Sequence, residues 1–187
     1  MKECVPRVGI TLLSLAFVVG CGSAPRGRPE TAAETAAILP RPYTAEQIRG
    51  EWIPGFTITL LQRTTAGPSL ERRSVLSADD EGLEIEYAPL DLEGNPAGEP
   101  RRKRSTWVEL RDHATFPADS ARREEAAQET PLGTLDGWLY TVRDADEGTT
   151  TELFFARSTP GAPIQMRTTR AGELVLELIQ IERHRPE

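Results

Sequence analysis

The chain has 187 residues, a length that suits one folded domain with a single hydrophobic core. Its 29 acidic residues outnumber the 22 lysines and arginines, and the formal net charge is −7. An acidic chain is repelled by phosphate backbones, so we exclude nucleic acid as a general partner.

The N-terminal segment has the pattern of an export signal. Lys2 and Arg7 supply positive charge, and residues 8–19 form an apolar run. This run is too short for a membrane-spanning helix, which needs about 20 apolar residues, and no stop-transfer segment follows it. The pattern therefore predicts a signal peptide over residues 1–20.

Residues 18–21 read Val-Val-Gly-Cys and resemble the lipobox of bacterial lipoprotein precursors. The resemblance implies cleavage between Gly20 and Cys21 and diacylation of the Cys21 thiol, which would anchor the protein to a membrane. Gly22 stands where an aspartate would favour retention in the inner membrane. We therefore expect anchoring at the outer membrane, facing the periplasm. An ordinary cleaved secretory signal is the alternative.

The rest of the chain divides at about residue 43. Residues 21–42 are small, polar and rich in proline, which predicts a flexible linker behind the lipid anchor. Residues 43–187 are expected to form a single β-rich globular domain. Because Cys4 lies in the predicted leader and Cys21 would carry lipid, no thiol remains for a disulfide, a zinc site or a nucleophile.

The predicted domain begins with a short helix and two strands. Thr44 and Gln47 fit a capping box, so we expect a helix that ends before Trp52. Apolar residues alternate with threonines over residues 56–60, which predicts a strand. Residues 70–77 predict a second, weaker strand.

The next segment continues with a strand, a loop and a second helix. Leucine, isoleucine and tyrosine alternate with glutamate over residues 83–87, which predicts a half-buried strand with an acidic outer face. Residues 92–100 contain Gly and Pro and are predicted to form a loop. A second capping box, Thr106 with Glu109, predicts the second helix. Residues 121–129 fit either helix or strand, and the strand is favoured.

The C-terminal part has the clearest alternation in the chain, with short turns between its segments. Strands are predicted over residues 138–142, 151–155, 164–168 and 174–181. The last of these has apolar residues on both faces, as expected for a central or doubly covered strand. The expected fold class is α+β, mainly β: a curved antiparallel meander, or half-barrel, with one or two short helices.

Three strings in this C-terminal part resemble bacterial envelope proteins with an incomplete β-barrel, the LolA/LolB-like lipoprotein carriers and related lipoproteins. They are residues 133–140 (Gly-Thr-Leu-Asp-Gly-Trp-Leu-Tyr), 154–157 (Phe-Phe-Ala-Arg) and 160–166 (Pro-Gly-Ala-Pro-Ile-Gln-Met). The resemblance implies a half-barrel whose concave face is covered by helices and, in some members, holds acyl chains.

Two functions fit these patterns. The first is a non-enzymatic envelope lipoprotein that acts as an interaction or scaffolding module and binds a protein partner. The alternative is a carrier that binds acyl lipid or another hydrophobic ligand on the concave sheet face. The candidate ligand face comprises Phe56, Ile58, Leu60, Leu153, Phe155, Leu174 and Leu176. Whether these residues fill a core or line a cavity separates the two functions.

No residue pattern predicts catalysis, a metal site or a cofactor. His113 and His184 are the only histidines, and Asp112 beside His113 is the one candidate acid–base pair. We interpret both histidines as exposed, and we expect the protein not to be an enzyme. The acidic clusters at residues 79–81 and 144–147 lack EF-hand spacing and are interpreted as turns.

A basic run and three tryptophans remain. Residues 101–104 (Arg-Arg-Lys-Arg) could contact lipid phosphates, but a solvated loop balanced by nearby acids is the simpler interpretation. Trp52, Trp107 and Trp138 occupy amphipathic positions and are predicted to lie in the core.

Overall fold

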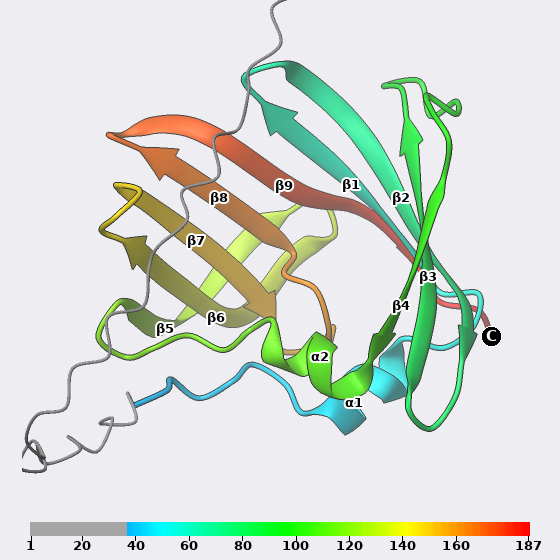
Figure 1. Ribbon diagram of the computed structural model, residues 1–187, viewed down its shortest axis with the longest axis horizontal. Helices are drawn as coiled ribbons and strands as arrows, with labels where there is room; N and C mark the ends of the chain where they lie inside the picture. Colours follow the sequence, from blue (N-terminus) through cyan, green and yellow to red (C-terminus); the bar gives the residue numbers. More distant parts are fainter. Residues whose placement is uncertain (1–36) are drawn as a thin grey trace, which may run out of the picture. The chain divides into compact units, whose positions relative to one another are not determined.

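The computed structural model describes residues 37–187, and in that part of the chain nine strands form one antiparallel sheet (Figure 1). The strand order is β4-β3-β2-β1-β9-β8-β7-β6-β5. The strands are β1 (Thr57–Thr64), β2 (Gly67–Ala78), β3 (Gly82–Leu90), β4 (Arg101–Thr106), β5 (Ala121–Thr130), β6 (Gly133–Asp144), β7 (Thr149–Ala156), β8 (Gln165–Arg170) and β9 (Glu173–His184).

The sheet curves strongly but does not close into a barrel, because β4 and β5 stand at its two ends without pairing to each other (Figure 1). The C-terminal strand β9 pairs with β1 and joins the two halves of the sheet. The predicted curved meander with two short helices is therefore confirmed. Residues 121–129, which fit either helix or strand, belong to strand β5.

Both helices begin at the capping boxes that the sequence contains. Helix α1 (Ala45–Glu51) is capped by Thr44 with Gln47, and helix α2 (Trp107–Asp112) by Thr106 with Glu109. The two helices pack against each other at one end of the concave side (Figure 1). Among the described residues no helix is long and apolar enough to cross a membrane.

The prediction of a solvated loop at residues 101–104 was wrong, because these residues form strand β4. Strand β4 pairs with β3 from Tyr87↔Arg101 to Gly82↔Thr106. The pairing satisfies backbone groups of β3 that would otherwise be left at a bare sheet edge. The balancing acids are present, since Arg102 lies 3.1 Å from Glu86 across the strand pair.

Residues 37–42, which the sequence assigned to the linker, lie against the domain. The amide of Leu39 donates to the carbonyl of Phe116 at 2.9 Å, and the amide of Ala118 donates to the carbonyl of Ala37 at 2.7 Å. The hydroxyl of Tyr140 donates to the carbonyl of Pro40. These bonds attach the segment to the chain around residues 116–118. Gly20 and Cys21, where cleavage and lipidation are predicted, lie outside the described residues.

The main core fills one end of the concave side. Side chains from both halves of the sheet meet there with those of the two helices: Tyr43, Ile48, Trp52, Phe56, Ile58, Leu60, Val75, Leu83, Ile85, Trp107, Ala114, Tyr140 and Phe155. Trp138 packs against this core while half-buried, so all three tryptophans lie in or beside it.

A smaller cluster lies on the opposite face of the sheet, around Phe154, Ala156 and Ile164. Phe154 and Phe155 are neighbours on β7, so their side chains point to opposite faces. The hairpin of β5 and β6 bends over the smaller cluster and contributes Leu135. Close packing at the bend requires glycine, since a Cβ on Gly137 would lie 2.9 Å from the Cα of Ala156.

Candidate functional site

The concave side contains an apolar pocket of about 300 Å³ next to the main core. Its floor is a row of three half-buried side chains from neighbouring strands, Leu153, Met166 and Leu178. The register places them side by side, because Leu153 is paired with Met166 and Met166 with Leu178. Directly paired residues share a face of the sheet, so this row forms one continuous apolar strip.

One end of the pocket is closed by α1 and by the loop of residues 157–164. The indole Nε1 of Trp52 donates to the carbonyl of Pro160 at 2.9 Å. The buried Gln180 amide donates to the carbonyls of Ala162 and Pro163 at 3.2 and 2.9 Å. These bonds satisfy loop carbonyls that lie close to the core, and they fix the loop as the wall of the pocket.

Two side chains on the other wall carry positive charge, Arg73 and Lys103. The guanidinium of Arg73 lies 5.3 Å from the centre of the Tyr87 ring, and that of Arg101 lies 4.5 Å from it. Glu71 accepts a hydrogen bond from Arg73 at 2.8 Å. The pocket thus combines an apolar floor with a basic wall on the β2–β4 side.

The seven residues of the candidate ligand face do not form one open surface. Phe56, Ile58, Leu60 and Phe155 belong to the packed core, with 3% exposure or less. Leu153 and Phe155 also line the pocket.

The two remaining candidates on β9 lie outside the pocket. Leu176 is half-buried, and Leu174 is 39% exposed. A register shift between Thr168 and Thr169 separates the pairing of Leu174 from that of Leu176, at the strand end next to the β8–β9 turn. Part of the candidate face is therefore filled core, and the open part lies further along β7, β8 and β9.

Sequence reasoning missed several residues of the pocket. Leu178 lies in a segment with apolar residues on both faces, and Met166 in a short alternating strand, so neither stood out. The strand register is the signal that unites them with Leu153. Arg73 carries no sequence signal for this position, and Lys103 was marked only as a member of the basic run 101–104. The place of both side chains depends on the pairing of β2, β3 and β4.

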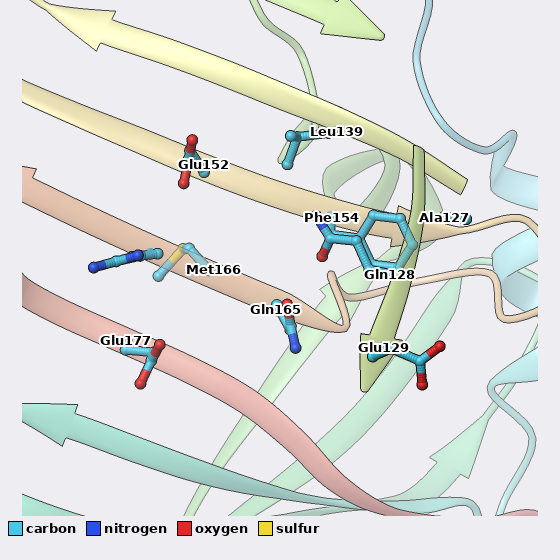
Figure 2. A pocket seen from close by; sticks show the side chains of 10 residues that line it. Ala127, Gln128, Glu129, Leu139, Glu152, Phe154, Gln165, Met166 and Glu177 are labelled. Carbon is cyan, nitrogen blue, oxygen red and sulfur yellow. The ribbon is translucent and has the colours of Figure 1, made fainter. Parts of the chain in front are cut away.

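A second pocket, of about 450 Å³, lies on the convex side between β5 and the strands β7 and β8 (Figure 2). Phe154 and Leu139 lie within it, but polar and charged side chains make up most of its lining. Glu152, Arg167 and Glu177 follow one another across three strands. Such a row of alternating charges is stable in contact with water, so the concave pocket is the better site for an apolar group.

His113, of the candidate acid–base pair, lines the concave pocket, but both members of the pair contact groups other than each other. The Nδ1 atom of His113 lies 2.6 Å from the carbonyl oxygen of Glu109, and the ring is exposed. Arg111 donates to the carboxylate of Asp112 and holds its pKa below the usual range, and Arg41 lies 3.2 Å from it. His184 is exposed at the end of β9.

The core tyrosine Tyr43 also has a structural role. Burial raises the pKa of Tyr43, and its hydroxyl donates to the carbonyl of Ala156. Over residues 37–187 no three His, Cys, Asp or Glu side chains are grouped to hold a metal ion.

Comparisons with known proteins show similarity in fold. No family model matches the chain, and no curated protein sequence matches it significantly. Among solved structures, MucB in complex with MucA(peri) superposes with a TM-score of 0.52 and 14% identity, over 76% of this chain and 53% of the MucB chain. MucB alone gives a TM-score of 0.51 at 14% identity, over 73% of this chain and 55% of MucB.

Two further solved structures also match. The MucA/MucB complex of Pseudomonas aeruginosa gives a TM-score of 0.51 at 14% identity, over 75% of this chain and 53% of that chain. An exported protein of Bacteroides fragilis with a YmcC-like fold gives a TM-score of 0.43 at 11% identity, over 72% of this chain and 99% of that chain. The chain thus spans about half the length of the MucB chains it matches, and its fold is similar to theirs.

Proposed function

We propose that this chain is a non-enzymatic envelope lipoprotein, anchored through Cys21, whose concave pocket binds an apolar segment of a protein partner. The observation that carries the proposal is the strip of Leu153, Met166 and Leu178, which is half-buried beside a filled core. The similarity to MucB, a protein solved in complex with MucA, supports binding of a protein by this fold.

The pocket suits a modest and specific interaction. Completing the burial of three half-exposed apolar side chains contributes about 1 kcal/mol each, from the ~1.5–3 kcal/mol of a fully buried side chain. The walls are held by hydrogen bonds such as that from Trp52 to Pro160. A pre-formed wall lowers the entropy cost of ordering the site on binding. Anchoring through Cys21 would keep the pocket close to membrane-associated partners.

A second candidate function is the carrier of acyl lipid. Its specific support is the combination of the apolar floor with the cations Arg73 and Lys103, which matches an acyl chain with an anionic end. The filled part of the concave side counts against a large lipid. Phe56, Ile58 and Leu60 leave no open space where they pack.

Site-specific photo-crosslinking tests the proposal and separates the two candidates. A benzoylphenylalanine replaces Leu178 in the pocket of the full chain, in its native host. A second variant carries the same group at Leu76, an exposed leucine of β2, as the matched control. We expect an adduct with one defined protein at Leu178 and none at Leu76. An adduct with the mass of a lipid would favour the carrier, and equal labelling at both positions would overturn a binding role for the pocket.

A further inference from the structure

The sheet edge formed by β4 concentrates positive charge in an acidic protein. Four of its six residues are basic: Arg101, Arg102, Lys103 and Arg104. The three arginine side chains are 71%, 61% and 50% exposed. β4 ends the strand order, so in residues 37–187 its outer side has no strand partner. Alternate residues of such an edge direct N–H and C=O groups away from the sheet.

The acids that balance these charges all lie on the inner side of β4. Arg101 contacts Glu71 of β2 at 3.4 Å, and Arg102 contacts Glu86 of β3 at 3.1 Å. Arg104 contacts Asp79, which precedes β3, at 2.6 Å. A guanidinium has five N–H donors, so one carboxylate contact leaves donors of each side chain free to meet a further group.

The basic side chains of β4 project from both faces of the sheet. Arg101 and Lys103 are paired with Tyr87 and Ile85, whose side chains belong to the concave side. Arg102 and Arg104 alternate with them and therefore point to the other face. A flat anionic membrane would meet one of these faces, whereas an added strand with acidic side chains would meet both.

We propose that β4 is a docking edge for an extended acidic segment of a partner protein, which adds to the sheet as a tenth strand beside β4. This proposal rests on the proposed function, the binding of a protein partner. It gives that partner a second contact surface, β4, beside the concave pocket. The backbone pairing supplies affinity, and alternating carboxylates that meet the basic side chains on each face supply specificity. Pairing of β4 with the β4 edge of a second copy of this chain is disfavoured, because like charges would face each other.

The opposite edge of the sheet provides an internal control. β5 carries Arg122 and Arg123 together with Glu124 and Glu125. Arg122 lies 2.9 Å from Glu124 on the same strand, so its charge is balanced locally. The two open edges therefore differ in charge while sharing the same kind of backbone, and an acidic strand should choose β4.

The test uses a fluorescent peptide of about eight residues in which glutamate alternates with threonine and valine, long enough to span β4 at ~3.4 Å per residue. Anisotropy is measured with the chain from residue 21 onward, carrying Cys21→Ser. Reversal of two charges by Arg102→Glu with Arg104→Glu should weaken binding at least about tenfold. Arg122→Glu on β5 is the matched control and should change the affinity less than about twofold.

Strand addition is separated from simple charge attraction by the same peptide with alternate backbone amides N-methylated. The methyl groups remove N–H donors and leave the carboxylates, so we expect binding to be lost. Equal binding of the methylated peptide would overturn the proposal. So would binding to phosphatidylglycerol vesicles, with the same dependence on Arg102 and Arg104, in the absence of peptide binding.

Hydrogen–deuterium exchange of the unsubstituted chain makes the result independent of any variant. Peptide binding should slow exchange of the outward amides of β4 and leave those of β5 unchanged. No change at β4 would contradict the proposal. Crosslinking at Leu178 reports the concave pocket and not this edge, so failure of one proposal is distinguishable from failure of the other.

Discussion

Replacement of Gly161 by alanine should loosen the wall of the concave pocket. Gly161 has a φ of +127°, and a Cβ at this position would overlap the indole Nε1 of Trp52 and lie 2.7 Å from its Cε2 atom. The same indole nitrogen donates to the carbonyl of Pro160. The substitution therefore separates the loop of residues 157–164 from Trp52, the C-cap residue of α1.

The expected cost follows from three contributions. An alanine in the left-handed region costs about 1 kcal/mol. Loss of the hydrogen bond between Trp52 and Pro160 costs about 1 kcal/mol, and the steric overlap with a buried indole adds about 1–3 kcal/mol. The free energy of unfolding should fall by about 3–5 kcal/mol in total.

Gly133→Ala is the matched control, because Gly133 also has a positive φ, +105°, but no atom lies within 4 Å of its expected Cβ. It should cost about 1 kcal/mol. Urea unfolding monitored by tryptophan fluorescence measures both variants. Equal destabilisation of the two would refute the idea that contact with Trp52 makes glycine necessary at residue 161.

Three further predictions concern the anchor, the loop and the response to acid. Cys21→Ser should move the protein from the membrane fraction to the soluble fraction and abolish labelling by an alkyne fatty acid, and retention in the membrane with labelling intact would exclude the predicted lipidation. Gln180→Leu removes the donor of two loop carbonyls, so the free energy of unfolding should fall by about 2 kcal/mol in urea titrations, and an unchanged value would show that the loop does not depend on this amide. The hydrogen bond from Arg104 holds the pKa of Asp79 below its usual 3.8, so the contribution of the Asp79 carboxylate to folding stability is present above that pH and is lost as the pH falls through the lowered pKa. The melting temperature of the unsubstituted protein should therefore drop more steeply below about pH 4 than that of Asp79→Asn. Parallel curves would contradict this assignment.

Local patterns predicted the elements that local interactions stabilise. The capping boxes of Thr44 and Thr106 marked the starts of both helices, because each hydroxyl accepts a hydrogen bond within its own first turn. Alternation marked strands β6 to β8, and apolar residues on both faces marked β9, because each of these strands has at least one face in an apolar environment.

Strand β4 could not be predicted in this way. Of its six residues only Ser105 is buried, so no alternation of apolar residues marks it as a strand. Pairing with β3 and ion pairs with acids on β2, on β3 and in the turn between them determine its conformation, and none of these partners is adjacent in sequence. Tertiary context commonly overrides the intrinsic preference of a strand in this manner.

The candidate site was predicted only in part for a related reason. Alternation identifies which residues face inward, but it does not distinguish a filled region from an open one. Phe56 and Leu153 both face the concave side, and packing of α1 against one end decides that the first is core and the second lines a pocket. The basic wall requires knowledge of which strands are neighbours.

Native mass spectrometry tests most directly the central claim that the concave pocket serves a protein partner. The chain from residue 21 onward, with Cys21→Ser, is purified from cells, measured intact and then extracted with organic solvent. We predict the mass of the bare polypeptide, unchanged after incubation with phospholipid or fatty acid. A discrete adduct that extracts as phospholipid or acyl lipid would contradict the claim and identify the pocket as the site of a lipid carrier.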